Sequence, residues 1–266
     1  MKKMILTDYP DVQLGDAEAY YNRGNEYYAK SDYDRAIADY TRAISLSPNL
    51  TGAYNNRGMA YDRKGNNDRA IADYTQAISL NPNLANAYNN RGLVYRNKGD
   101  NDRAIADYTQ AISLNPNYAK AYNNRGMAYD RKGDYDRAIA DYTLSISLNP
   151  NYPNVYKNRG IAYYYKGDYD RAIADYTEAI SLNPNYAGAY FNRGIAYDAK
   201  GDNDRAIADY TQAISLIPND TDAYNNRGIA YYYKGDYARA QADCSKVLEI
   251  DPNNSTARNI LEAIKG

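Results

Sequence analysis

Small and apolar residues recur along the chain in pairs of short helical patterns. A glycine turn separates the two patterns of each pair, and a proline follows the second pattern. Between positions 51 and 84 they fall into two groups with helical spacing: Ala53, Tyr54, Gly58, Ala60 and Tyr61, then Ala70, Ile71, Tyr74, Ala77, Ile78 and Leu80. Gly65 can adopt the left-handed conformation that ends a helix, and Asn66, an aspartate in the other repeats, can cap the next one. Pro82 stops the second helix. The pattern predicts a helical hairpin.

This hairpin pattern returns every 34 residues without a gap, and repeats of that length indicate a stacked array. Steps of 34 from Ala17 give seven units: 17–50, 51–84, 85–118, 119–152, 153–186, 187–220 and 221–254. One hairpin is too small to bury its own apolar face, so neighbouring units must supply the core. We therefore predict an all-α solenoid. We expect residues 255–266 to form a capping helix and residues 1–16 to be less structured.

The repeat resembles the tetratricopeptide repeat in all seven units, which together cover 238 of the 266 residues. The signature positions of the second unit are Tyr54, where the family usually has Trp, then Gly58, Tyr61, Ala70, Tyr74, Ala77 and Pro82. The resemblance implies a right-handed superhelix of antiparallel helix pairs whose first helices line a concave groove. It also implies that an extended peptide or a helix of a partner protein binds in that groove, with no catalysis and no cofactor.

Composition excludes several other functions. Lys plus Arg number 32 against 33 Asp plus Glu, and no run of like charges attracts nucleic acid or an anionic membrane. The chain has no histidine, and its one cysteine, Cys244, is interpreted as a packing residue. No phosphate-binding, metalloprotease or Cys-x-x-Cys motif occurs, so we expect no enzyme, metal or cofactor. No apolar run suits a signal peptide or a membrane span, so we expect a cytoplasmic protein.

One asparagine stands two residues before the glycine of every first helix, although asparagine disfavours helix interiors by very roughly half a kcal/mol relative to alanine. An amide both donates and accepts, so it can hold a peptide backbone whatever the peptide side chains are. In the tetratricopeptide family a similar row of amides binds extended peptides. We call this row the asparagine ladder: Asn22, Asn56, Asn90, Asn124, Asn158, Asn192 and Asn226. Two alternatives stay open: duplication simply copied the asparagine, or each amide holds the neighbouring repeat.

Other first-helix positions vary between repeats while the second helix hardly changes, which is typical of a binding face. An apolar stripe follows the ladder by three residues, and longer side chains lie further along. These groove candidates are Met59, Leu93, Met127, Ile161, Ile195, Arg63, Arg96, Arg131 and Tyr165. Packing against the adjacent helix is the alternative for the apolar members. The Lys and Asn set with which some family members clamp a chaperone tail is incomplete, so we do not expect that ligand.

Each repeat also carries one arginine directly before the glycine, where the family often has Leu, and one aspartate before the tyrosine of the second helix. Arginine is seldom half-buried without a partner. We therefore predict a repeating ion pair that fixes the stacking register. The sequence does not name a partner, and it leaves one architectural alternative: a natural or designed scaffold that forms homo-oligomers through its end faces and uses no peptide groove.

Overall fold

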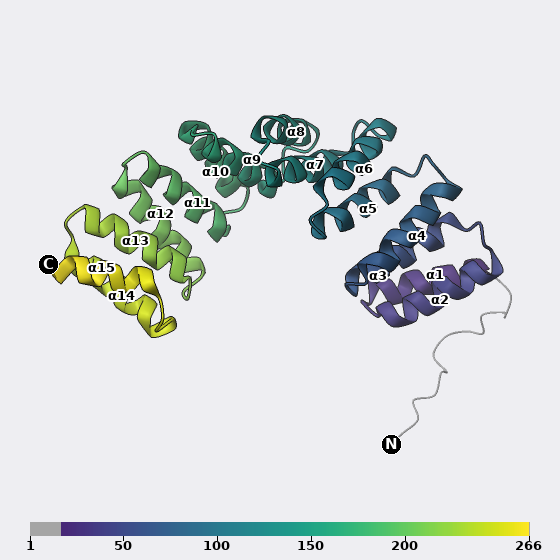
Figure 1. Cartoon of the computed structure of the whole chain (residues 1–266), viewed down its shortest axis with the longest axis horizontal. Helices are drawn as coiled ribbons and strands as arrows, with labels where there is room; N and C mark the ends of the chain where they lie inside the picture. Colours follow the sequence, from purple (N-terminus) through teal and green to yellow (C-terminus); the bar gives the residue numbers. More distant parts are fainter. Residues whose placement is uncertain (1–16, 266) are drawn as a thin grey trace, which may run out of the picture. The chain divides into compact units, whose positions relative to one another are not determined.

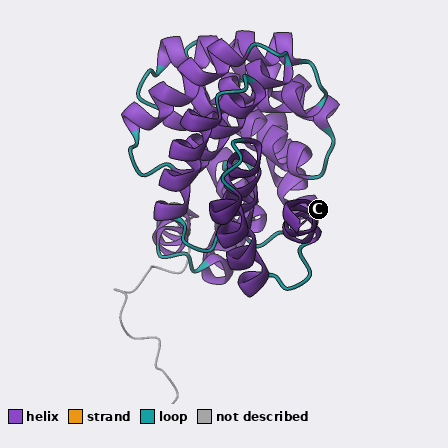
Figure 2. Ribbon diagram, turned by 90° about the vertical axis from the view of Figure 1, so that its left-hand side faces the viewer, coloured by secondary structure: helices purple, strands orange, loops and turns teal. Residues whose placement is uncertain are grey.

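The computed structural model describes residues 17–265, and these residues form helices joined by short turns, without a strand (Figures 1 and 2). The first helices of the repeats are α1 (Ala17–Ala29), α3 (Thr51–Arg63), α5 (Ala85–Asn97), α7 (Ala119–Arg131), α9 (Pro153–Tyr165), α11 (Ala187–Ala199) and α13 (Thr221–Tyr233). The second helices are α2 (Tyr33–Leu46), α4 (Asn67–Leu80), α6 (Asn101–Leu114), α8 (Tyr135–Leu148), α10 (Tyr169–Leu182), α12 (Asn203–Leu216) and α14 (Tyr237–Ile250). Helix α15 (Ser255–Lys265) follows. The all-α expectation is confirmed, and the expectation for residues 1–16 lies outside the described residues.

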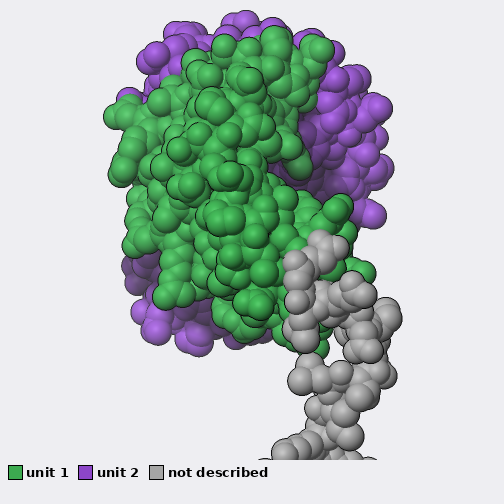
Figure 3. All heavy atoms as spheres, turned by 90° about the vertical axis from the view of Figure 1, so that its right-hand side faces the viewer, with its two compact units in different colours: residues 1–128 green, residues 129–266 purple. Residues whose placement is uncertain are grey.

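The chain divides into two compact units, residues 1–128 and residues 129–266, coloured separately in Figure 3. Unit 1 contains α1 to α6 and most of α7, and unit 2 contains α8 to α15. In unit 1 each first helix contacts the next, α1 with α3 and α3 with α5, and in unit 2 α9 contacts α11 and α11 contacts α13. Within the described part of each unit no second helix contacts another second helix. The first helices therefore lie on the inner side of each stack.

Turn chemistry sets the helix ends within each repeat. Gly65 has φ +76° at the end of α3, the left-handed region that glycine adopts without steric cost. Aspartates such as Asp100 cap the following helix by accepting from the backbone N–H three residues later, here that of Arg103. The prediction is wrong at Asn66, whose side chain makes no capping hydrogen bond to α4.

A tyrosine ring packs against the helix-interior glycine in five of the six repeats before the last one, which explains the glycine at this position. Tyr74 is 1% exposed, and a Cβ atom added to Gly58 would lie 2.9 Å from its Cε1. A methyl group does not fit there, so the cost of glycine in a helix, about 1 kcal/mol, is offset by closer helix packing. In the last repeat Cys244 replaces the tyrosine, and a Cβ atom added to Gly228 would lie 3.5 Å from its Sγ.

Helix α15 closes the C-terminal end of unit 2. Its Ala257 is fully buried against Cys244 and Val247, with Ile260 and Leu261 packed alongside. Burial raises the pKa of the Cys244 thiol to about 11, so it packs as a neutral side chain, as predicted. The opposite face of α15 presents exposed polar residues, Arg258, Asn259 and Glu262. The predicted capping helix is therefore present.

Candidate binding surface on the first helices

The structure places one ladder asparagine on each first helix, and six of the seven are half-buried, Asn22 being exposed. The ladder is not uniform, however. Its members differ in what their amides bind. At four of these positions, Asn56, Asn124, Asn192 and Asn226, the contact or its absence can be related to the residue that lies 35 positions earlier, in the preceding repeat.

In unit 1, two ladder amides are bound to the preceding repeat. The Asn56 Nδ2 donates to Tyr21 Oη at 3.1 Å and to Asn25 Oδ1 at 2.8 Å. The Asn124 Nδ2 donates to Asn89 Oδ1 at 3.0 Å. Asn89 is itself 5% exposed, so this amide pair lies in the interface between two repeats. For Asn56 and Asn124, the interpretation that the amide holds the neighbouring repeat is therefore correct.

In unit 2, the amides of Asn192 and Asn226 make no hydrogen bond with any described residue. The residues 35 positions earlier are Lys157 and Phe191. A lysine ammonium has no acceptor lone pair, and a phenyl ring offers no hydrogen-bonding atom of the kind Tyr21 and Asn89 provide. Lys157 instead lies over a tyrosine ring, with Nζ 5.6 Å from the centroid of Tyr186. These two half-buried amides retain their donors and acceptors.

The predicted apolar stripe is half-buried at every position and serves partly as packing. Met59 packs against the cluster of Ala70, Tyr74 and Val94, and Ile161 packs against the corresponding cluster in unit 2. Leu93, Met127 and Ile195 are half-buried in the same way. In unit 1 the stripe borders a pocket of about 100 Å³ lined by Asn25, Tyr28, Tyr40, Asn56 and Met59. A pocket of that volume suits one side chain.

The four longer groove candidates do not form one site. Arg96 is 8% exposed, with its Nη1 3.2 Å from Met127 Sδ, so it is an interior residue of unit 1. Arg63 and Arg131 are exposed at the ends of α3 and α7. Tyr165 is 63% exposed and stacks on Tyr135 of α8, with ring centroids 5.4 Å apart. It therefore lies beside the start of a second helix.

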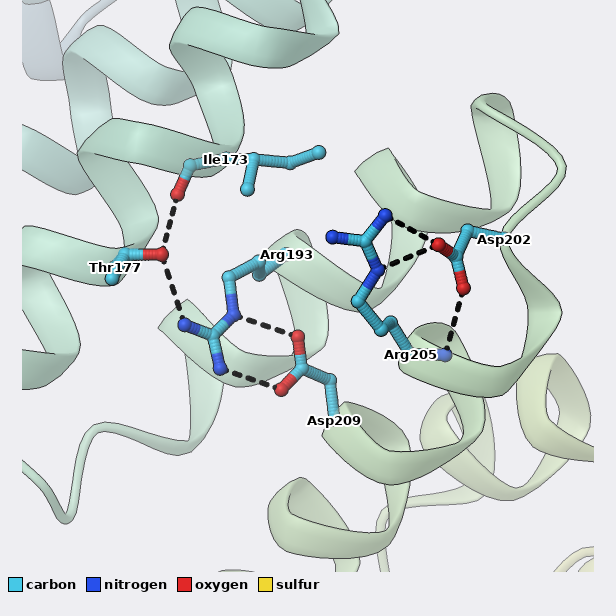
Figure 4. Close-up of polar contacts among 6 residues, drawn as sticks. All are labelled: Ile173, Thr177, Arg193, Asp202, Arg205 and Asp209. Atoms are coloured by element: carbon cyan, nitrogen blue, oxygen red, sulfur yellow. Dashed lines mark hydrogen bonds and ion pairs between the residues drawn. The ribbon is translucent and has the colours of Figure 1, made fainter.

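The predicted arginine–aspartate pairs form, with both carboxylate oxygens bound by one guanidinium. In Figure 4 the Nε and Nη2 of Arg193 each donate to Asp209 at 2.8 Å. The aspartate side chain is 8% exposed and the arginine side chain 17%. The same geometry is observed for Arg23 with Asp39, Arg57 with Asp73, Arg91 with Asp107, Arg159 with Asp175 and Arg227 with Asp243. A bidentate pair fixes orientation as well as charge.

From the second repeat on, the remaining guanidinium nitrogen of these arginines, Nη1, makes a hydrogen bond that the sequence did not lead us to expect. Arg193 Nη1 donates to Thr177 Oγ1 at 2.9 Å, and Thr177 belongs to the preceding repeat. The threonine hydroxyl in turn donates to the Ile173 carbonyl at 2.8 Å (Figure 4). The signal was present in the sequence, because a threonine follows the tyrosine of the second helix in each of the first six repeats. The arginine therefore joins the two helices of its own repeat to the repeat before it.

A second link between repeats lies on the outer surface. The lysine at the end of a first helix pairs with an aspartate in the first turn of the preceding second helix. The pairs are Lys64 with Asp34, Lys98 with Asp68, Lys166 with Asp136, Lys200 with Asp170 and Lys234 with Asp204. The aspartates are at least 80% exposed, and such surface pairs contribute little, about 0–1 kcal/mol each.

Residues 17–265 contain no group of His, Cys, Asp and Glu side chains that could hold a metal ion. None of the helices in this part of the chain is long and apolar enough to cross a membrane.

Stacked helical hairpins joined by bidentate arginine–aspartate pairs define a helical-repeat protein. Models of the tetratricopeptide repeat match residues 17–50, 52–84, 73–106, 119–152, 153–186, 175–208 and 221–254, and a TPR repeat model matches 92–133 and 196–235. The chain belongs to the tetratricopeptide repeat family.

Solved structures share the fold. A tetratricopeptide repeat protein from Parabacteroides merdae ATCC 43184 is 22% identical with a TM-score of 0.68, covering 94% of this chain and 99% of that chain. MamA is 32% identical with a TM-score of 0.58, covering 60% of this chain and 94% of that chain. YrrB, described as a TPR protein with an unusual peptide-binding site, is 24% identical with a TM-score of 0.62, covering 71% and 97%. Among curated proteins, none matches the sequence.

Proposed function

We propose that this chain is a non-catalytic scaffold that binds an extended peptide of another protein across its first helices. Membership of the tetratricopeptide repeat family supports the scaffold role, since these repeats are generally non-catalytic. The observation that carries the peptide proposal is the pair of amides in unit 2, Asn192 and Asn226, which make no hydrogen bond with described residues. In this proposal Asn56 and Asn124 stabilise the stack, and Asn192 and Asn226 bind the peptide.

An extended peptide fits these amides chemically. Every peptide residue other than proline presents one N–H and one C=O, and a carboxamide satisfies one of each. Asn192 and Asn226 stand one repeat apart on α11 and α13, so they can hold two points of the same backbone. The half-buried side chains of Ile161, Ile195 and Ile229 lie three residues after ladder positions and offer apolar contact beside the amides. Binding through backbone groups leaves side-chain selection to other residues.

Matched double variants test this proposal. A phage-displayed library of 12-residue peptides supplies the probe, and the affinity of a selected peptide is then measured by fluorescence anisotropy. We expect Asn192→Ala with Asn226→Ala to weaken binding at least about tenfold, the loss of roughly one to two hydrogen bonds, with helicity unchanged. Asn56→Ala with Asn124→Ala is the control, which should lower stability and keep affinity within a factor of about three.

The opposite pattern, with binding lost in the unit 1 variant and kept in the unit 2 variant, contradicts the proposal, and so does a library that yields no binder.

The architectural alternative predicts self-association through the end faces. The polar outer face of α15 opposes it at the C-terminal end, because Arg258 and Glu262 are exposed there. Light scattering across a concentration series separates the two, since end-to-end assembly makes the mass concentration-dependent whereas a peptide-binding monomer keeps one mass.

A further inference from the structure

The first repeat differs from the others at the position three residues after the ladder asparagine. The later repeats carry methionine, leucine or isoleucine there, whereas the first repeat carries Asn25. Met59 packs against the cluster that contains Tyr74 of its own second helix, and Ile161 packs in the same way against the cluster that contains Tyr176. In the first repeat the corresponding tyrosine is Tyr40, and Asn25 supplies no aliphatic side chain to pack against it.

A pocket of about 100 Å³ lies at this place in unit 1, lined by Asn25, Tyr28, Tyr40, Asn56 and Met59. The Tyr40 side chain is 1% exposed while the other four are half-buried, so Tyr40 forms the closed end of the pocket. The Tyr28 ring is supported from behind by Tyr33, with ring centroids 5.5 Å apart. The aromatic walls are therefore held by packing within the first repeat.

Most of the polar atoms that line the pocket are already bonded to one another. The Tyr40 hydroxyl donates to Asn25 Oδ1 at 2.9 Å, and the Asn56 Nδ2 donates to the same oxygen at 2.8 Å. These two bonds use both lone pairs of that oxygen. None of the five side chains that line the pocket is a carboxylate, ammonium or guanidinium. A polar side chain would have to compete for these bonds, whereas an aliphatic side chain needs none.

One donor at the pocket has no partner. The Asn25 Nδ2 makes no hydrogen bond with any described residue, and it can donate to a main-chain carbonyl. An aliphatic side chain next to a carbonyl is what a peptide residue presents. The combination therefore favours a residue of another protein over an isolated apolar molecule.

We infer that this pocket binds one leucine-sized aliphatic side chain of a partner protein, in the place that the chain's own methionine or isoleucine fills in other repeats. An apolar cavity of about 150 Å³ holds benzene. A pocket of about 100 Å³ is therefore too small for an aromatic ring and suits a branched chain of four carbons. The pocket shares no residue with the Asn192 and Asn226 pair of unit 2, so this inference does not rest on the proposed function.

Capped amino acids test the pocket directly. The full chain is labelled with ¹³C at its methionine methyl groups, with Met59 as the reporter and Met127, which does not line the pocket, as the reference. N-acetylleucine methylamide is titrated, with the asparagine compound as a polar control of similar shape and the phenylalanine compound as a larger one. We expect a saturable shift of the Met59 resonance and an affinity for the leucine compound at least about tenfold above both controls. Equal affinity for either control, or no Met59 response, would overturn the inference.

Two variants at neighbouring positions of α1 test the location. Asn25→Met places in the first repeat the side chain that the second repeat has, so it should fill the pocket and weaken the leucine compound at least about tenfold. Asn22→Met adds the same side chain at an exposed position outside the pocket, and it should leave the affinity unchanged. Circular dichroism checks that helicity is kept. Should Asn25→Met fail to fold, Tyr28→Ala removes one wall and leaves the Asn25 hydrogen bonds in place. Unweakened binding in a folded Asn25→Met or Tyr28→Ala chain contradicts the inference.

A peptide library separates the pocket from the unit 2 amides. The selection uses the chain with Asn192→Ala and Asn226→Ala, so that those amides cannot contribute. Selected peptides should lose about tenfold in affinity when one leucine, isoleucine or methionine is changed to alanine, and a similar factor when Asn25→Met is introduced. Peptides that bind independently of both changes, or a selection without binders, would overturn the partner-protein assignment. Either result leaves the proposed function standing, because that function is tested on the chain with Asn192 and Asn226 intact.

Discussion

Asn56 and Asn124 of unit 1 make different contacts from Asn192 and Asn226 of unit 2, although all four stand at the same position of the repeat. In unit 1, the Asn124 Nδ2 donates a hydrogen bond to Asn89 Oδ1 of the preceding repeat at 3.0 Å. In unit 2, Asn192 and Asn226 have no such acceptor because Lys157 and Phe191 stand where Asn89 or Tyr21 stand in unit 1. For these residues, the side chain 35 positions earlier accounts for whether an identical asparagine bonds to the preceding repeat or makes no hydrogen bond with described residues. Five comparisons of variants at matched sites test how far the repeats are equivalent, and one of them tests this contrast directly.

The largest effect should come from the arginine–aspartate ladder, which is common to both units. Asp73→Ala in unit 1 and Asp209→Ala in unit 2 each leave a half-buried guanidinium without its carboxylate, and we expect each to lose about 3 kcal/mol. The measurement is guanidinium chloride unfolding followed by circular dichroism and fitted to a nearest-neighbour model. A clear difference between the two losses would show that the ladder is not equivalent in the two units.

Alanine at the helix-interior glycines should have the next largest effect. A Cβ at Gly194 would lie 2.6 Å from Tyr210 Cε1, so Gly194→Ala and its unit 1 equivalent Gly58→Ala should lose about 2 kcal/mol. Gly228→Ala, where the nearest contact is 3.5 Å, should instead gain about 0.5–1 kcal/mol from helix propensity. Thermal unfolding of the three variants gives the order, and a loss at Gly228 would contradict the packing argument.

Asparagine substitutions address the contrast directly. Asn124→Ala removes an interface hydrogen bond and leaves the buried Asn89 oxygen unpaired, which should cost about 1 kcal/mol. Asn192→Ala removes no hydrogen bond among the described residues and should gain about 0.5 kcal/mol from helix propensity. Repeat-resolved hydrogen exchange should show faster opening near α5 and α7 only in the first variant. Equal destabilisation would show that the two amides are equivalent.

The helix caps give a smaller effect of the same kind. Asn66 makes no capping bond, whereas its counterpart four repeats later, Asp202, accepts from the Arg205 backbone N–H at 3.1 Å. Asn66→Asp should therefore stabilise α4 by about 0.5–1 kcal/mol. The reverse change, Asp202→Asn, should destabilise α12 by a similar amount. Both are measured as shifts in the midpoint of chemical unfolding, and an unchanged midpoint for Asn66→Asp would contradict the expectation.

The pH dependence should distinguish Asp198 from Asp62. Burial raises the pKa of Asp198, so the folded state holds this proton more tightly and stability falls as pH rises above the unfolded value of about 3.9. Asp198→Asn cannot ionise, and it should be more stable than the parent at pH 7 and lose that advantage below about pH 4. Asp62→Asn should gain less, because the Arg63 charge opposes the rise that burial causes in the pKa of Asp62. The free energy of unfolding is measured for the parent and both variants at the two pH values. A stability advantage of Asp198→Asn that grows on acidification would contradict the expectation.

The fold could be predicted from the sequence because the 34-residue period fixes helices, turns and stacking together. The arginine–aspartate pairs followed from burial and from one residue of each charge per repeat. The division of the ladder did not, because all seven asparagines look alike when each repeat is considered alone. Their difference depends on contact with a residue 35 positions away, which becomes evident only once the register of stacking is known. For the same reason the threonine partner of each arginine was not predicted before the helices were placed.

The threonine contact has a consequence for how such a chain changes its length. Every link of this kind runs from the arginine of one repeat to the threonine of the repeat before it, as from Arg193 to Thr177. Each of the first six repeats carries both the donor and the acceptor. Recombination between two copies can therefore insert or delete a whole 34-residue repeat and form the same junction without any new interface, so that array length can vary while the chemistry of stacking is preserved.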